Sequence, residues 1–263
     1  MKPSRRSSID SAERAGYLPA LSSIAKAMCV PFWWHGRDHS GGYSILYNGT
    51  VCFLDTGSRR IAFTADHVLA QYIADIERDS EVVCQFGSAT VAPETRIIDR
   101  NPNLDLATID VSDVLVGSTG GSFHLPITWP TKPLLESDAL LLGGYPGTLR
   151  VEKAVTADLP FQWIAGKVNS TSNSNIGIHL DLANLHWPLH PGETFNKQLG
   201  GMSGGPVFRF VSYPIERLEL VGVIYEYHEG YELMLARPAQ FIHSNGLIIP
   251  NATAASEETP LRQ

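Results

Sequence analysis

Cysteine is scarce in this sequence, because only Cys29, Cys52 and Cys84 occur among its 263 residues. An odd, low count is unlike the disulfide framework of small secreted domains and suits a reducing compartment. No apolar run approaches the length of about 18 residues that a membrane-spanning helix needs, so no membrane partner is expected. The N-terminal segment MKPSRRSSIDSAERAG also lacks the apolar centre of a signal peptide. These absences predict a cytoplasmic protein.

Positive charge is also in short supply. The formal net charge is −7, and no basic stripe runs along the chain. Nucleic acid is therefore not expected as a partner. Hydrophobic residues make up 43% and charged residues 18% of the chain, a balance that excludes a disordered protein. No cofactor and no metal site are predicted.

Glycine, in contrast, gathers around a single serine in GGMSGGPVF, residues 200–208. Without a Cβ atom, the backbone can turn tightly and direct several N–H groups at one oxygen. Two such groups form an oxyanion hole, which stabilises the tetrahedral intermediate of acyl transfer. The motif therefore makes Ser203 a candidate nucleophile. The alternative is a glycine-rich turn in which the serine is merely polar.

A serine nucleophile needs a base, and the base needs a partner that orients it. His67 follows the apolar run of IAFTADHVLA, residues 61–70, and Asp105 opens the alternating part of NPNLDLATIDV, residues 101–111. Either residue alone is more often structural or solvated than catalytic. Their order along the chain, His67, Asp105, Ser203, with gaps of 38 (105 − 67) and 98 (203 − 105) residues, favours the catalytic interpretation.

These three segments resemble the signature motifs of the trypsin-like (chymotrypsin-fold) serine peptidases. The matching stretches are Thr64-Ala65-Asp66-His67, Asp105-Leu106-Ala107 and Gly201-Met202-Ser203-Gly204-Gly205-Pro206. Two shorter matches agree with them, Asn48-Gly49-Thr50 before the histidine segment and Gly144-Tyr145-Pro146-Gly147 early in the second half. The resemblance covers about residues 40–250.

The resemblance implies an all-β fold of two packed antiparallel six-stranded β-barrels, with an N-terminal helical extension and a short C-terminal helix. It also implies that Ser203 attacks a peptide carbonyl, His67 transfers the proton and Asp105 orients the imidazole. The N–H groups of Gly201 and Ser203 would form the oxyanion hole. The expected function is that of an intracellular serine endopeptidase with restricted specificity or regulated activity, which acts on protein or peptide substrates.

Two positions depart from the pattern of secreted relatives. Val68 stands where many of them have a disulfide cysteine beside the histidine, so the chain resembles the bacterial type that lacks this bridge. Met202 stands where many have an acidic residue that pairs with a freed N-terminus. We therefore expect control by another route, with an activating protein partner and a resting Gly201 N–H that points away from the oxyanion hole.

Substrate specificity is the least defined part of the resemblance. Six residues are expected to line the primary pocket: Lys197, Gln198, Leu199, Tyr225, Glu226 and Tyr227. Lys197, six residues before Ser203, would favour an acidic side chain before the scissile bond. Alternatively, Tyr225 or Tyr227 would block a deep pocket and favour small side chains.

The chain divides into four expected segments. Residues 1–42 form an extension whose short amphipathic helix places Leu21, Ile24, Ala25 and Met28 on one face. Residues 43–120 form the first barrel, with His67 and Asp105, and a glycine- and serine-rich break ends it. Residues 121–250 form the second barrel, with Ser203, and residues 251–263 form a flexible tail.

The same residues admit three other interpretations. The segment around Ser203 also matches the nucleophile elbow of α/β-hydrolases, but that fold needs its acid and histidine after the serine. Only 60 residues follow Ser203, and they are mainly strand-like. A catalytically silent binding module on the same fold, and an esterase that uses the same triad, both stay open as alternatives.

Overall fold

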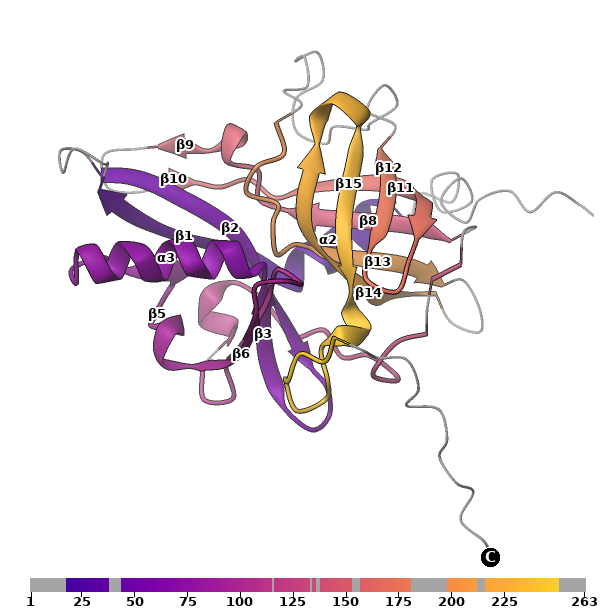
Figure 1. The fold of residues 1–263 in the computed structure, drawn as a ribbon, viewed down its shortest axis with the longest axis horizontal. Coiled ribbons are helices and arrows are strands. Elements are labelled where there is room, and N and C mark those ends of the chain that lie inside the picture. Colours follow the sequence, from indigo (N-terminus) through magenta and orange to yellow (C-terminus); the bar gives the residue numbers. More distant parts are fainter. Residues whose placement is uncertain are drawn as a thin grey trace, which may run out of the picture.

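Two antiparallel β units make up most of the protein in this computed structural model (Figure 1). The structure describes residues 18–37, 44–114, 116–132, 134–135, 138–152, 157–180, 198–211 and 216–250. The expected tail at residues 251–263 and the first 17 residues of the expected extension lie outside these ranges.

The first unit is a seven-stranded antiparallel sheet with the strand order β5-β4-β1-β2-β3-β7-β6. Alternating burial shows how it packs, because Phe32 and Trp34 of β1 are buried while Trp33 between them is partly exposed. Its strands are β1 (Cys29–Arg37), β2 (Ser44–Asp55), β3 (Arg60–Thr64), β4 (Cys84–Phe86), β5 (Ala89–Val91), β6 (Ile97–Asn101) and β7 (Leu106–Asp110).

The second unit is a closed barrel of six antiparallel strands in the order β11-β12-β15-β14-β13-β8. Its strands are β8 (Ala139–Gly144), β11 (Gln162–Thr171), β12 (Ile176–Leu180), β13 (Pro206–Val211), β14 (Arg217–His228) and β15 (Leu233–Pro238). A small separate ribbon consists of β9 (Val151–Glu152) and β10 (Ala157–Asp158). Closure satisfies the backbone groups of the strand edges, which makes this unit a rigid support.

The predicted all-β, two-unit architecture is confirmed, with three differences in detail. Residues 29–37, expected in the extension, form strand β1, which pairs with β2 and β4 inside the first sheet. This sheet has seven strands and ends at β5 and β6, so it is an open half-barrel and not a closed barrel of six strands. In place of the expected C-terminal helix there is one 3₁₀ turn, Ala239–Phe241.

Helix α2 (Leu18–Ala27) packs where the two units meet. Leu21 and Ala25 are buried in a core cluster that also contains Cys29 of the first sheet and Phe208 of the second barrel. Ile24, expected on the same face, is 44% exposed. The apolar face of the helix is therefore narrower than its spacing predicts, and it helps to join the units.

Helix α3 (Asp66–Arg78) lies along the first sheet (Figure 1). Val68, Leu69 and Tyr72 are buried on the side that faces the sheet. The indole Nε1–H of Trp34 donates to Asp75 Oδ2 at 2.8 Å, which ties the helix to strand β1. The helix is thus packed on the sheet from its first turn, at Val68, to its last turn, at Asp75.

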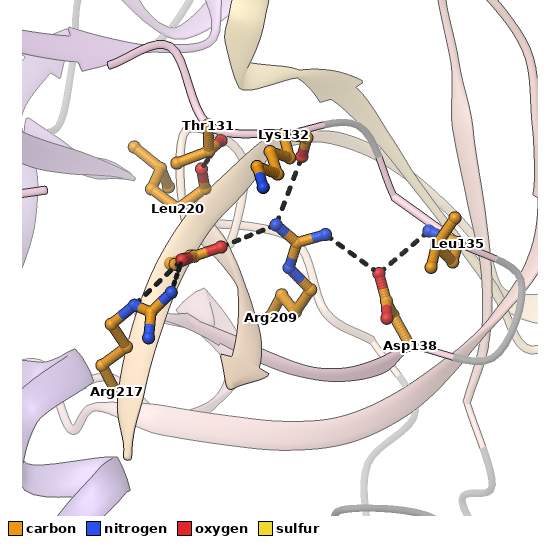
Figure 2. Close-up of polar contacts among 8 residues, drawn as sticks. Thr131, Lys132, Leu135, Asp138, Arg209, Arg217 and Leu220 are labelled. Atoms are coloured by element: carbon orange, nitrogen blue, oxygen red, sulfur yellow. Dashed lines mark hydrogen bonds and ion pairs between the residues drawn. The ribbon is translucent and has the colours of Figure 1, made fainter. Parts of the chain in front are cut away.

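The segment that connects the units is fixed to the second barrel by Arg209 of β13 (Figure 2). Its guanidinium contacts Asp138 at 3.2 Å and Glu219 at 2.6 Å, and it donates to the carbonyl of Lys132 at 3.4 Å. Burial of these charges is tolerable because the cation lies between two carboxylates. The linker therefore packs on β13 and β14.

Among the described residues, no helix is both long and apolar enough to cross a membrane. The same residues contain no cluster of three or more His, Cys, Asp or Glu side chains arranged to hold a metal ion. Cys29, Cys52 and Cys84 are buried and have free thiols. Burial raises the pKa of Cys52 and Cys84, which keeps both thiols protonated.

Candidate active site

His67 lies in the first turn of helix α3, directly after the buried strand β3. The rigid strand and helix leave its side chain 52% exposed and accessible to a substrate. The neighbouring carboxylate of Asp66 is buried and paired with Arg100, with Nε at 2.6 Å from Oδ1 and Nη2 at 3.1 Å from Oδ2. The charge of Asp66 is thus balanced by Arg100.

Asp105 holds His67 through both carboxylate oxygens. Its Oδ2 lies 2.7 Å from the ring nitrogen Nδ1, and its Oδ1 accepts the backbone N–H of His67 at 2.8 Å. Asp105 ends the turn between β6 and β7 with φ of 51°, a left-handed conformation that aspartate tolerates better than most residues. A carboxylate at Nδ1 favours the tautomer that carries its proton there, which leaves Nε2 free to act as a base.

Ser203 lies in the glycine-rich turn before strand β13. Its Oγ donates a hydrogen bond to the carbonyl oxygen of Tyr225 at 3.4 Å. Within the described residues, no hydrogen bond joins Ser203 to the ring of His67. The structure therefore contains the expected contact between Asp105 and His67, and it leaves the serine turned toward the second barrel.

The glycines around Ser203 are required by close packing. Gly204 has φ of +87°, and a Cβ atom there would lie 2.1 Å from the carbonyl oxygen of Thr50 and 2.3 Å from Thr64 Oγ1. Gly201 has φ of +97°, and its Cβ would lie 2.5 Å from Asn48 Nδ2. Any side chain at either position would displace the turn from the first sheet.

Two backbone N–H groups of this turn, those of Gly201 and Ser203, donate to no acceptor in the described part of the chain. The carbonyl of Gly200 accepts a hydrogen bond from Gly147 N–H at 2.7 Å. Because the C=O and N–H groups of a trans peptide point in opposite directions, the Gly201 N–H is directed away from Gly147. A flipped peptide would lose the contact with Gly147, and the direction of the Gly201 N–H relative to a bound oxyanion stays a prediction.

Apolar anchors replace the missing ionic tether of this turn. Met202 is fully buried and Leu199 is 3% exposed, both in the core of the second barrel. Met202 N–H also closes the turn by donating to the carbonyl of Leu199 at 3.1 Å. These two side chains hold the segment before Ser203 in the core of the second barrel.

Thr50 of strand β2 joins the serine turn to the first sheet, and motif reasoning gave it no role at the site. Its N–H donates to the carbonyl of Ser203 at 2.9 Å, and its Oγ1 donates to the carbonyl of Gly201 at 2.9 Å. The same Oγ1 accepts the N–H of Tyr145 at 3.1 Å. The only sequence signal was its place in Asn48-Gly49-Thr50, which does not reveal its partners.

A cavity of about 350 Å³ opens beside Ser203. Five of the six expected pocket residues line it, namely Gln198, Leu199, Tyr225, Glu226 and Tyr227, while Lys197 lies outside the described residues. Ile224 and Met234 also contribute to the wall. Apolar side chains thus form much of the cavity, with Glu226 and Glu229 as its carboxylates.

No family model matches the chain, and no curated protein matches it. The chain is similar to a number of solved structures, two of which share 14% sequence identity with it. One, from work on coupled folding and binding of the intrinsically disordered Sesbania mosaic virus VPg protein, has a TM-score of 0.46 and covers 84% of this chain and 100% of its own. The other, a Glu endopeptidase in complex with MPD, has a TM-score of 0.47 and covers 83% and 87%.

The arrangement of the two units decides the fold. His67 and Asp105 lie just after strand β3 and just before strand β7 of the first sheet, and Ser203 lies in the turn before strand β13 of the closed barrel. The chain has a chymotrypsin-like fold.

Proposed function

We propose that this protein is a serine endopeptidase that cleaves protein or peptide substrates through an acyl-enzyme. One observation carries the proposal: the two contacts between Asp105 and His67 hold the imidazole with Nε2 free for proton transfer. The N–H groups of Gly201 and Ser203 support it, because they donate to no acceptor among the described residues. An oxyanion hole needs donors that are free in this way.

In the proposed reaction, Ser203 Oγ first turns from the Tyr225 carbonyl toward His67. Nε2 takes the hydroxyl proton as Oγ bonds to the substrate carbonyl carbon, and the Gly201 and Ser203 N–H groups bind the resulting oxyanion. His67 then gives that proton to the leaving nitrogen as the C–N bond breaks. Water, deprotonated by the same imidazole, hydrolyses the ester and restores Ser203.

Regulation in this proposal acts on the serine side chain and less on the oxyanion hole. The turn that would form the hole is held by Gly147, Leu199 and Met202, whereas Ser203 Oγ bonds to the Tyr225 carbonyl and would have to turn toward His67. A bound substrate or an activating protein partner would supply that step. We propose a cytoplasmic setting, which the low cysteine count favours.

A catalytically silent binding module is the second candidate, and one observation favours it. Ser203 Oγ is bonded to the Tyr225 carbonyl and has no hydrogen bond to His67 in the described part of the chain. A serine locked in this position would make the cavity a binding site only. The two candidates therefore differ in whether Ser203 can be acylated or phosphonylated.

Labelling with a fluorophosphonate probe tests the proposal. We expect the wild-type protein to be labelled, and the variants Ser203→Ala and His67→Ala to show no labelling above background. His67→Ala is the informative control, because it keeps the serine hydroxyl and removes only the base. If the folded wild-type protein is not labelled even at high probe concentration, the endopeptidase proposal is rejected and the binding module remains.

Peptide libraries then separate an endopeptidase from an esterase. An endopeptidase cleaves internal amide bonds in unstructured peptides, and an esterase turns over only activated esters. Cleavage-site preferences in the same library test the cavity at Gln198, Tyr225 and Tyr227. An acidic preference before the scissile bond would support the role expected for Lys197, and a preference for small residues would support blockage by tyrosine.

A further inference from the structure

Arg237 of strand β15 reaches from the second barrel to the turn of the first unit that carries Asp105. Its Nε donates to the carbonyl of Leu104 at 2.6 Å, and its Nη2 donates to the carbonyl of Asn103 at 3.4 Å. These two residues directly precede Asp105. The guanidinium thus binds the backbone from which the carboxylate of Asp105 projects.

The other side of the Arg237 guanidinium is fixed within the second barrel. It lies over the ring of Tyr225, at 4.0 Å from the centroid, and Nη1 donates to the carbonyl of Ser174 at 3.1 Å and to Asn175 Oδ1. The hydroxyl of Tyr225 donates to the same Asn175 Oδ1 at 3.0 Å. Such a set of contacts leaves the guanidinium little freedom, since cation–π stacking and hydrogen bonds restrain the same plane.

This cluster connects the two halves of the site. Tyr225 also accepts the hydrogen bond of Ser203 Oγ through its backbone carbonyl, so one residue touches both the serine and Arg237. Arg237 in turn holds the turn before Asp105, and Asp105 holds His67. A path of direct contacts therefore runs from the serine on one unit to the histidine on the other.

The turn before Asp105 has few internal restraints. Leu104 N–H donates to the carbonyl of Asn101 at 3.1 Å and to its Oδ1 at 3.0 Å, and Asp105 N–H donates to the carbonyl of Pro102 at 3.3 Å. These bonds fix the N–H groups only. The turn also carries the left-handed conformation of Asp105, a state that persists where the surroundings hold it.

From these contacts we infer that Arg237 is a positioning residue, which sets the carboxylate of Asp105 toward His67 by binding the carbonyls of Asn103 and Leu104. The inference rests on the proposed function of the site, although Arg237 itself touches no reacting atom. Lysine would not replace it fully, because an ammonium lacks the planar fork that binds two carbonyls and stacks on a ring.

The test compares Arg237→Met and Arg237→Lys with a matched control, Arg59→Met. Arg59 is also an arginine that joins the first unit to a distant segment, because its Nη1 donates to the carbonyl of Asn245 at 3.2 Å and its Nε to Asp110 at 3.1 Å. A general loss of stability between the units would affect both methionine variants. A loss of positioning would affect only those at Arg237.

Three measurements are made on the full chain: the acylation rate with an activated peptide ester, the thermal unfolding midpoint, and the NMR signal of the His67 Nδ1–H proton. For Arg237→Met we expect the kcat of ester turnover to fall by about 10- to 100-fold, the scale of a small misplacement of a catalytic group. KM should change less than about twofold. The Nδ1–H signal should broaden through faster exchange with water. The kcat and the Nδ1–H signal of Arg237→Lys should be intermediate between those of the wild type and Arg237→Met. Arg59→Met should resemble the wild type in both.

Each outcome decides the inference. Wild-type kcat and an unchanged Nδ1–H signal in folded Arg237→Met would overturn it, as would equal losses in Arg59→Met. If the activated ester does not acylate the wild type, the proposed function fails. The Nδ1–H signal of the two methionine variants still decides whether Arg237 positions Asp105. If Arg237→Met does not fold at the assay temperature, the same comparison is made with Arg237→Lys.

Discussion

Asp105 is the residue on which the geometry of the candidate base depends. Its two oxygens bind the backbone N–H and the ring Nδ1 of His67 at 2.8 and 2.7 Å, so it sets both the place and the tautomer of the imidazole. An asparagine at this position would keep the shape of the side chain, but its amide would present an NH₂ group to one of these partners. The two contacts thus give the carboxylate a role that packing alone would not.

We predict that Asp105→Asn lowers kcat by about 10⁴-fold, the scale seen when an orienting aspartate becomes asparagine and the imidazole takes the wrong tautomer. The thermal midpoint should change little, because the side-chain volume is kept and asparagine tolerates the left-handed conformation. Steady-state kinetics and calorimetry on the same preparation check both parts. A loss of activity that follows a matching loss of stability would contradict the orienting role.

The identities of the candidate catalytic residues could be predicted because each stands inside a short motif with its own local cause. Gly204 next to Ser203, for example, is required because Thr50 and Thr64 leave no room for a Cβ atom there. Arg237 and Thr50 could not be predicted in this way. Their partners at the site, the carbonyls of Leu104 and Gly201, lie more than 100 residues away, and a backbone carbonyl is the same in every residue type and gives no sequence signal.

At the level of elements, strand β2 carries the most consequential contacts between the units. Thr50 binds the carbonyls of Gly201 and Ser203, and Asn48 Nδ2 donates to the carbonyl of Tyr145 at 2.7 Å. One strand of the first sheet thus fixes the serine turn of the second barrel. The orientation of the Gly201 and Ser203 N–H groups, the proposed oxyanion donors, depends on this strand as well as on the turn itself.

We predict that Thr50→Val lowers the free energy of unfolding by about 1–3 kcal/mol, because the Gly201 carbonyl and the Tyr145 N–H both lose their partner. Acylation should slow by about tenfold or more, because the Gly201 peptide that carries one oxyanion donor is no longer held. Thr50→Ser keeps the hydroxyl and is the matched control. Chemical denaturation and pre-steady-state acylation measure the two effects, and equal behaviour of the two variants would exclude the hydroxyl as the cause.

Strand β1 shows where element prediction failed and why. The run of residues 29–37 is expected in the N-terminal extension, whereas the alternation of burial at Phe32, Trp33 and Trp34 is typical of a strand. Pro31 within the run also weighs against a strand, since proline cannot donate to a ladder. The open first sheet has a similar origin, because β4 and β5 have only three residues each and carry little periodic signal.

At the scale of the whole molecule, His124 marks the seam between the units. Its backbone pairs with strand β2, with N–H to the Phe53 carbonyl at 2.8 Å and carbonyl to the Asp55 N–H at 2.9 Å. Its ring packs edge-on against Phe208 of the second barrel, with centroids 5.5 Å apart. The side chain is 4% exposed, and neither ring nitrogen has a hydrogen-bond partner among the described residues.

Burial lowers the pKa of His124 to about 4 from its ordinary value of 6.5, while the charge of Glu219 acts weakly in the opposite direction. Between these two values the unfolded chain binds a proton that the folded protein does not. The contribution of His124 to the free energy of unfolding therefore falls as the pH falls from about 6.5 to about 4, by about 3 kcal/mol for a shift of this size.

We predict that His124→Phe removes this part of the pH dependence, because phenylalanine keeps an aromatic ring against Phe208 and cannot take up a proton. Urea unfolding at several pH values between about 4 and 7 measures the effect as a smaller slope of the unfolding free energy against pH. His243→Gln, at an exposed histidine, controls for the loss of one histidine. If His124→Phe and the wild type lose stability in parallel over this range, proton uptake at the seam is not what destabilises the fold in acid.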